Sequence, residues 1–101
     1  MSVNYHYNES NQRITFYPRG GFTEKVAAIV NEVESKHPFD TLHAIVFDFK
    51  NTEFIDSRGI GLLFIIHDKT RGTKAKISIV NANTTILSLL KRSGLDTIYQ
   101  I

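Results

Sequence analysis

Asp56 and Ser57 are the two residues of this sequence whose types and position could do chemistry. They stand between a polar corner at residues 50–53 and a strongly apolar run. Aspartate and serine are preferred at helix starts, because a side-chain oxygen can accept a hydrogen bond from the free N–H groups of the first turn. A helix start also carries a partial positive charge, which would stabilise a phosphoryl group on Ser57. Gly59 and Gly61 keep the first turn bare, so another molecule can approach the backbone.

Catalysis by Ser57 is disfavoured by its neighbours. The elbow of an α/β-hydrolase needs the pattern G-x-S-x-G, and Ile55 stands where the first glycine belongs. A triad of that fold would need a histidine late in the chain, and none follows His67. We therefore predict that the chain is not an enzyme. A purely structural role, in which Ser57 only caps a helix, is the alternative.

Metal and cofactor sites are not predicted either. The chain has no cysteine, and its four histidines (His6, His37, His43 and His67) lack the close spacing of metal ligands. A phosphate-binding loop of the type G-x-x-x-x-G-K-[ST] is absent, and Gly59-Ile60-Gly61 alone is weak evidence for a nucleotide site. We expect no metal and no cofactor.

Length and charge restrict the class of protein. With 101 residues, of which 42% are hydrophobic, the chain predicts a single domain over residues 1–101. A net charge of +2 without a basic stripe argues against nucleic-acid binding. The N-terminus lacks the layout of a signal peptide, and the apolar run at residues 60–66 is too short to span a bilayer. These features predict a cytoplasmic protein without membrane insertion.

Hydrophobic periodicity predicts the elements that position Asp56 and Ser57. Two strands near residues 3–7 and 14–16 form a hairpin, and Pro18-Arg19-Gly20-Gly21 ends the second one. Thr23 is a plausible N-cap for a helix that ends near Lys36. There follow a strand at 42–49, a helix at about 58–71, a strand at 76–80, a helix around 86–92 and a closing strand or segment at 97–99. The order ββαβαβαβ predicts an α/β fold with a mixed sheet covered by helices.

Two further features of this pattern concern the site. The helix at 58–71 is apolar nearly all round in its first two turns, so we expect it to be buried. Asp48 lies at the end of the central strand. In open α/β sheets, functional residues lie outside the carboxyl ends of the parallel strands, so we expect Asp48 at the same end of the sheet as Ser57. Asp48 could contribute to a site there, or it could merely cap the loop Lys50-Asn51.

The segment Phe54-Ile55-Asp56-Ser57-Arg58-Gly59-Ile60-Gly61, preceded by an apolar strand and Asp48, resembles the STAS domains, typified by bacterial anti-sigma factor antagonists. The resemblance covers nearly the whole chain and is specific between about Ile45 and Leu63. It implies a mixed sheet with helices packed on it. It also implies that a partner kinase phosphorylates Ser57. Many members of the family have a second Ser or Thr where this chain has Arg58.

The resemblance implies a bacterial partner-switching regulator. The unmodified chain would bind a kinase-type anti-sigma factor or a related switch protein, and phosphorylation of Ser57 would release it. The expected contact residues are Asp48, Asn51, Thr52, Asp56, Arg58, Gly59 and Ile60. A metal-dependent serine phosphatase would reset the switch, and ATP and metal would belong to these partners. Two alternatives stay open: a permanent STAS subunit docked on the ATPase of an ABC transporter, and a small-ligand sensor.

Overall fold

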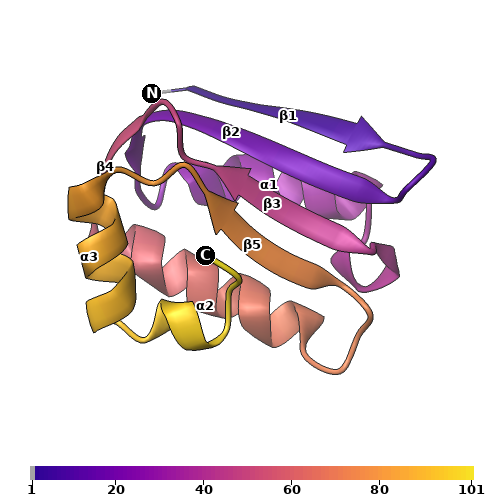
Figure 1. The fold of residues 1–101 in the computed structure, drawn as a ribbon. Coiled ribbons are helices and arrows are strands. Elements are labelled where there is room, and N and C mark those ends of the chain that lie inside the picture. The colour runs from indigo at the N-terminus through magenta and orange to yellow at the C-terminus, as the bar shows by residue number, and fades with distance from the viewer. Residues whose placement is uncertain (1) are drawn as a thin grey trace.

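A five-stranded mixed sheet and three α-helices make up the computed structural model, which describes residues 2–101 (Figure 1). The strands are β1 (Ser2–Asn8), β2 (Arg13–Phe22), β3 (Ala44–Asp48), β4 (Thr52–Ile55) and β5 (Lys76–Val80). The helices are α1 (Val26–Lys36), α2 (Ser57–Thr70) and α3 (Thr84–Arg92), with single 3₁₀ turns η1 (Phe39–Thr41) and η2 (Leu95–Thr97). The predicted α/β fold with a mixed, helix-covered sheet is confirmed.

The predicted hairpin is present as the antiparallel pair β1–β2. Its register runs without interruption from Ser2 opposite Arg19 to Asn8 opposite Arg13. Along β2, Ile14 and Phe16 are buried while alternate residues are more exposed. Side chains of a strand point alternately to the two faces of a sheet, so this alternation shows that one face forms the core.

Strand β2 is longer than the sequence predicts, and this extension leads to β4. Its first residues, Arg13–Phe16, pair in parallel with β3, and its last residues, Gly20–Phe22, pair in parallel with β4. The register with β4 shifts between Gly20 and Gly21, where β4 has the extra residue Glu53. The expectation that residues 18–21 end the strand is therefore wrong. The strand continues to Phe22, which gives β4 a partner.

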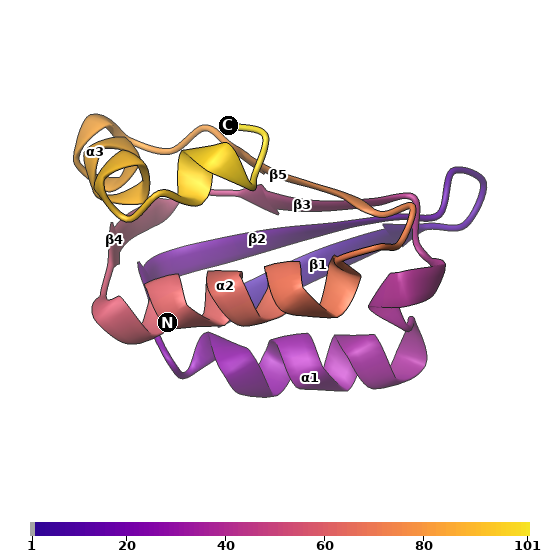
Figure 2. The same cartoon turned by 90° about the horizontal axis from the view of Figure 1, so that it is seen from below.

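The helices lie in two places relative to the sheet. Helices α1 and α2 cover one face of it, and α3 with η2 lies on the β5 side of the molecule (Figure 2). All of these elements contribute to one hydrophobic core, in which the rings of Phe16 and Phe47 stack with centroids 5.0 Å apart. None of the helices in residues 2–101 is long and apolar enough to cross a membrane.

Three expectations about individual elements need correction. Lys25, not Thr23, is the N-cap residue of α1, and the Thr23 hydroxyl instead accepts a hydrogen bond from the Lys25 N–H. The apolar residues of α2 are not all buried, because Phe64 and Ile65 project outward and are 37% and 52% exposed. Of the two alternatives predicted for residues 97–99, the strand of the order ββαβαβαβ is absent and a closing segment is present, with η2 and one bridge between Ser78 and Gln100.

Tyr99 connects the end of the chain to α2. Its side chain is buried, and its hydroxyl donates a hydrogen bond of 2.6 Å to the backbone carbonyl of Leu63. Burial raises the pKa of Tyr99 well above its ordinary value of about 10, because the phenolate would lose its hydration there. The C-terminal segment is thus fastened to the middle of the helix that begins at Ser57.

Candidate functional site

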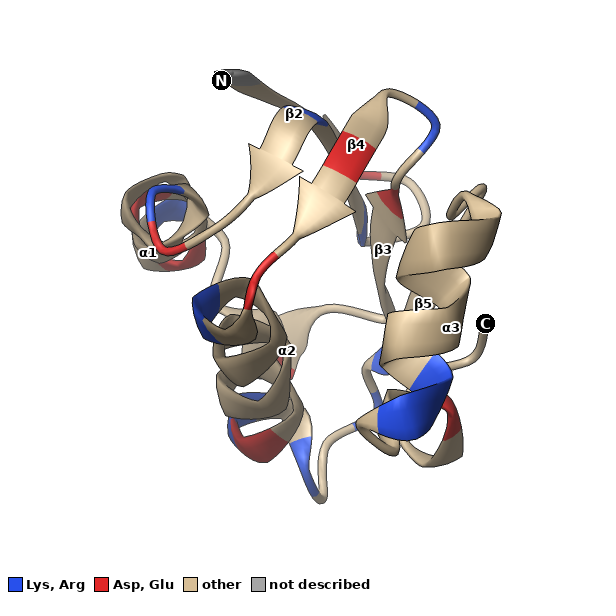
Figure 3. Cartoon of the chain, turned by 90° about the vertical axis from the view of Figure 1, so that its left-hand side faces the viewer, with Lys and Arg blue, Asp and Glu red and all other residues tan. Residues whose placement is uncertain are grey.

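The site is built where β4 runs directly into α2. Figure 3 faces this end of the molecule, with the acidic segment between β4 and α2 in red. Asp56 has extended backbone angles and is the N-cap of α2, and its Oδ1 accepts a hydrogen bond of 2.8 Å from the Gly59 N–H. The Asp56 carbonyl accepts the first helical bond, from Ile60 N–H at 3.0 Å. Ser57 is consequently the first residue of the helix, and it is exposed.

The first turn of α2 packs tightly against the end of β2. A Cβ placed on Gly59 would lie 2.1 Å from the carbonyl oxygen of Phe22, so this position requires glycine. The expectation that Gly59 leaves room for another molecule therefore differs from the structure, where Phe22 of the same chain fills that space. Gly61 has no neighbouring atom within 4 Å of the corresponding position. The close contact at Gly59 makes the platform under Ser57 rigid.

An exposed aromatic ring lies beside the helix start. Phe54, in β4, is 54% exposed, and the end of its ring contacts Gly21, where an added Cβ would lie 2.3 Å from the ring Cζ. The ring borders an open depression of about 380 Å³. This depression is lined by Gly20, Gly21, Thr23, Glu24, Lys25, Phe54 and Asp56. An apolar group held against glycine backbone is thus presented next to Ser57.

The charges near Ser57 come from α2 and from the segment before α1. Arg58 forms an ion pair with Glu24, and both side chains are largely exposed, at 70% and 52%. Exposed pairs of this kind contribute little to stability, typically up to about 1 kcal/mol. The pair consequently leaves the Arg58 guanidinium free to exchange Glu24 for another acidic group.

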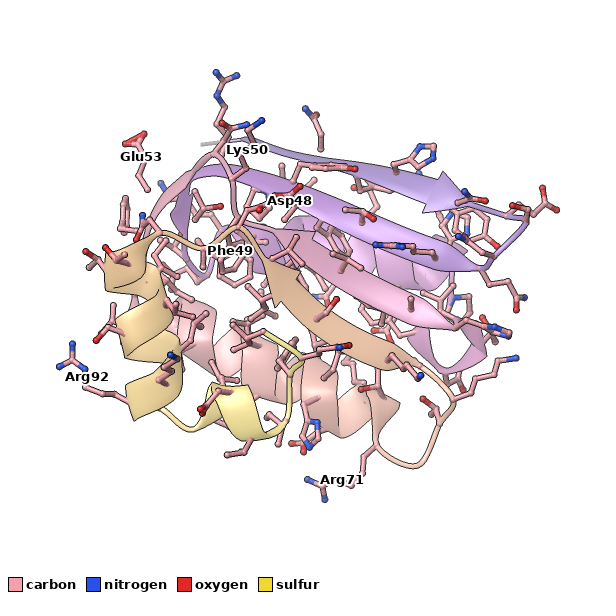
Figure 4. The ribbon with its side chains drawn as sticks, viewed as in Figure 1. Asp48, Phe49, Lys50, Glu53, Arg71 and Arg92 are labelled. Carbon is pink, nitrogen blue, oxygen red and sulfur yellow. The ribbon has the colours of Figure 1, made fainter. Side chains whose placement is uncertain are left out.

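The loop after β3 brings Asp48, Asn51 and Thr52 to the same end of the sheet. Asp48 Oδ1 accepts hydrogen bonds from the Lys50 N–H at 3.0 Å and from the Asn81 side-chain amide at 3.1 Å. Figure 4 shows Asp48 and Lys50 together at the end of β3. Asp48 thus caps the loop, which was one of its two predicted roles, and any contact of Asp48 with a partner stays a prediction.

Asn51 and Thr52 differ in accessibility. Asn51 is exposed, and its backbone carbonyl accepts a hydrogen bond from the Gly20 N–H. Thr52 is 3% exposed, and its hydroxyl donates to the Pro18 carbonyl at 2.8 Å. The hydroxyl of Thr52 is therefore engaged within the chain, so a partner could reach this part of the loop chiefly through Asn51.

Sequence reasoning did not single out three residues of this region. Phe54 was named only as part of the segment that resembles the STAS domains, with no role of its own, and Glu24 lies far from Arg58 in the chain. Asn83 is the N-cap of α3, and its amide also donates to the carbonyls of Thr52 and Glu53, at 3.5 and 3.3 Å. The only sequence signal among these was the type of Asn83, since asparagine is a preferred cap.

The mixed, helix-covered sheet and the exposed serine at a helix start are the features that the resemblance to STAS domains leads one to expect. The family model of the STAS domain matches residues 9–101. The chain is a member of the STAS domain family. A curated relative, a STAS-domain containing protein of Pseudomonas aeruginosa (strain UCBPP-PA14), is 29% identical over 56 residues. That match spans 55% of each chain, so the chain matches about half the length of this relative.

Solved structures of anti-sigma factor antagonists have the same fold. SpoIIAA in its unphosphorylated form superposes with a TM-score of 0.80 at 16% identity, over 98% of this chain and 86% of that one. The Bacillus SpoIIAA in its phosphorylated form gives 0.74 at 16% identity, over 98% and 89%. An anti-sigma factor antagonist from Mycobacterium paratuberculosis gives 0.69 at 18% identity, over 98% and 84%.

Proposed function

We propose that this chain is a partner-switching regulatory protein of the anti-sigma factor antagonist type. In its unmodified form it binds a kinase-type anti-sigma factor or a related switch protein through the start of α2, and phosphorylation of Ser57 releases that partner. The observation that carries the proposal is the position of Ser57, exposed as the first residue of a helix whose cap is Asp56. The phosphorylated form of SpoIIAA, which has the same fold, supports the choice of mechanism.

The physical effect of phosphorylation follows from this position. A phosphoryl group adds a charge of about −1.5 to −2 at neutral pH. At the start of a helix this charge is favourable for the fold, because the first-turn N–H groups and the helix dipole face it. Ser57 points to solvent, so the added group leaves the core unchanged. It would instead enter the contact with the partner, where an uncompensated dianion costs desolvation energy.

The required free energy is modest. Weakening the complex by 3–4 kcal/mol, roughly 160- to 900-fold, would move a regulator between bound and free states. Asp56 and Glu24 already place two carboxylates beside Ser57, and Arg58 is the neighbouring cation. Their formal charges sum to −1, so a phosphate would make an already negative edge of the interface more negative, at about −2.5 to −3. The chain itself needs no cofactor for this, since the kinase supplies ATP and metal and a serine phosphatase removes the phosphate.

The direct test is phosphorylation by the serine kinases encoded near this chain, read by intact-mass measurement. Wild type is expected to gain one phosphoryl group, and Ser57→Ala is expected to gain none. Thr84→Ala is the matched control, because Thr84 is also an exposed first residue of a helix. It should be modified as wild type is.

Binding must then respond to the modification. Titration of the kinase with unmodified and phosphorylated chain should show the loss of affinity given above. A stable complex with a transporter ATPase, unaffected by any modification of Ser57, would contradict the switch and favour a permanent subunit. Phosphorylation on Thr84 in place of Ser57 would also contradict it.

A further inference from the structure

The two edge strands of the sheet, β5 and β1, differ in whether another segment pairs with their outer side. Figure 1 shows β5, beside the C-terminal segment, at one edge and β1 at the other. The β5 edge is covered, because Ile79 N–H donates to the Gln100 carbonyl at 2.9 Å and Gln100 N–H donates to the Ile77 carbonyl at 3.0 Å. Within residues 2–101, no segment pairs with the outer side of β1.

Strand β1 also lacks the features that usually protect such an edge. Natural edge strands are commonly short, bulged, or marked by charged residues and proline. Strand β1 has seven residues, SVNYHYN, with no Lys, Arg, Asp, Glu or Pro. All seven pair with β2 in one unbroken register, so the strand is regular along its length. A regular, uncharged strand with free N–H and C=O groups is suited to accept another strand.

We propose that two copies of this chain associate through β1, antiparallel and related by a two-fold axis at Tyr5. In the register that uses the whole strand, Val3 lies opposite Tyr7 of the second copy, and Asn4 lies opposite His6. Tyr5 faces its own counterpart. The two sheets join into one continuous sheet through these strands.

The side chains fit this register. Val3 and Tyr7 are half-buried and pack against the core, and pairs of β-branched and aromatic residues are favourable across strands. Tyr5, which is 38% exposed, lies on the same face, with its ring centroid 6.3 Å from that of Phe16. On the opposite face, Asn4 and His6 can form hydrogen bonds. No two Lys, Arg, Asp or Glu side chains of β1 oppose each other, because β1 contains none.

Sedimentation velocity over the micromolar to millimolar range tests the association. Wild type should pass reversibly from monomer to dimer as its concentration rises. Tyr5→Lys places two like charges directly opposite at the axis, and it should weaken the dimer at least tenfold. Tyr17→Lys is the matched control, because Tyr17 is similarly exposed, at 42%, but lies on the interior strand β2. A monomer at every concentration, or a dimer that Tyr5→Lys leaves intact, would overturn the proposal.

Cross-linking tests the register without relying on a charged variant. The natural chain has no cysteine, so Tyr5→Cys introduces a single thiol on the proposed axis. Residues directly opposite in an antiparallel pair have Cβ atoms about 4.5–5.5 Å apart, close to the span of a disulfide. Mild oxidation should therefore cross-link Tyr5→Cys at least tenfold faster than Tyr17→Cys. Equal rates for the two variants would show that β1 is not the interface.

Discussion

Helices α2 and α3 begin with nearly the same local geometry, yet only one of them carries the candidate site. In each, a cap residue accepts a hydrogen bond of 2.8 Å from the N–H three residues on: Asp56 from Gly59, and Asn83 from Ile86. In each, the first helical residue is an exposed hydroxyl residue, Ser57 or Thr84. A capped helix start with a hydroxyl is therefore not sufficient to define a site.

The difference lies in what each helix start contacts. The first turn of α2 is seated on Phe22 through Gly59, and the exposed ring of Phe54 lies beside it. The start of α3 is joined instead to β4, through the amide of Asn83. The comparison indicates that a rigid seat and an exposed apolar neighbour distinguish the start of α2. Four changes test this difference, from the largest expected effect to the smallest.

The largest effect is expected for Gly59→Ala. Its added methyl would lie 2.1 Å from a backbone oxygen, which cannot move without shifting β2 or α2, so we expect a loss of about 3 kcal/mol. Gly61 is two residues further along the helix, and a Cβ added there would meet no atom within 4 Å. Gly61→Ala should therefore stabilise the helix by about 0.5–1 kcal/mol. Urea unfolding monitored by circular dichroism measures both. Equal effects of the two changes would show that the seat at Phe22 is not rigid.

The next effect concerns binding and rests on the proposed function. Ser57→Asp introduces one negative charge at the contact, and we expect it to weaken the kinase complex by about 2 kcal/mol, roughly 30-fold. Thr84→Asp places the same charge at the start of α3 and should leave the affinity unchanged. Calorimetric titration gives the affinities. Both variants should keep the thermal stability of wild type, because an acidic residue is favourable at a helix start. A large loss of fold with Ser57→Asp would contradict the local action of the charge.

Tyr99 joins the segment after α3 to α2, so Tyr99→Phe tests whether the two helices are coupled. Below pH 10 the variant should be less stable by about 1 kcal/mol, since the Leu63 carbonyl loses its buried donor. Because the pKa of Tyr99 is raised in the folded protein, the hydroxyl of Tyr99 loses its proton at a lower pH in the unfolded chain than in the folded one. Wild type should therefore lose stability as the pH rises above 10, by up to about 1.4 kcal/mol per pH unit from this group.

In Tyr99→Phe this contribution is absent, so the stabilities of the two proteins should converge above pH 10. Denaturant titrations at several pH values follow the convergence. Parallel curves at all pH values would show that Tyr99 ionises as easily in the folded protein as in the unfolded chain.

The smallest difference is expected between the stability losses caused by removing the two N-cap side chains, Asp56 and Asn83. Asp56→Ala and Asn83→Ala should each cost about 1 kcal/mol, since each removes one side-chain acceptor from a first turn. Salt separates them: the charged Asp56 also interacts with the helix dipole, and added salt screens that part of its contribution. Melting temperatures in low and high salt measure this. A cost for Asn83→Ala that is just as sensitive to salt would remove the distinction.

Most of the fold could be predicted from periodicity, and the exceptions have physical reasons. Strand β4 was missed because Thr52–Ile55 is only four residues long and is buried at its two ends, without strict alternation. It forms because β2 continues to Phe22 and offers it a partner. Of the two alternatives for residues 97–99, the closing segment is the correct one, because Tyr99 enters the core, which leaves a single bridge at Gln100.

The sequence predicted the roles of Asp56 and Ser57 in the candidate site, but not the residues that surround them. The residue types of Asp56 and Ser57 indicate a cap followed by an exposed hydroxyl, and local hydrogen bonding suffices to place them there. The exposure of Phe54 depends on where β2 ends, and the space at Gly59 depends on Phe22. Such contacts join residues far apart in the sequence, so spacing alone cannot reveal them.

The contact between Phe54 and Gly21 also provides a spectroscopic reporter. The ring current of Phe54 shifts the resonances of the Gly21 Hα protons, because one of them points toward the Cζ end of the ring. Any molecule that displaces the ring changes those frequencies, even if it never touches Gly21. A single pair of glycine protons can thus signal occupancy of this surface in an unlabelled protein.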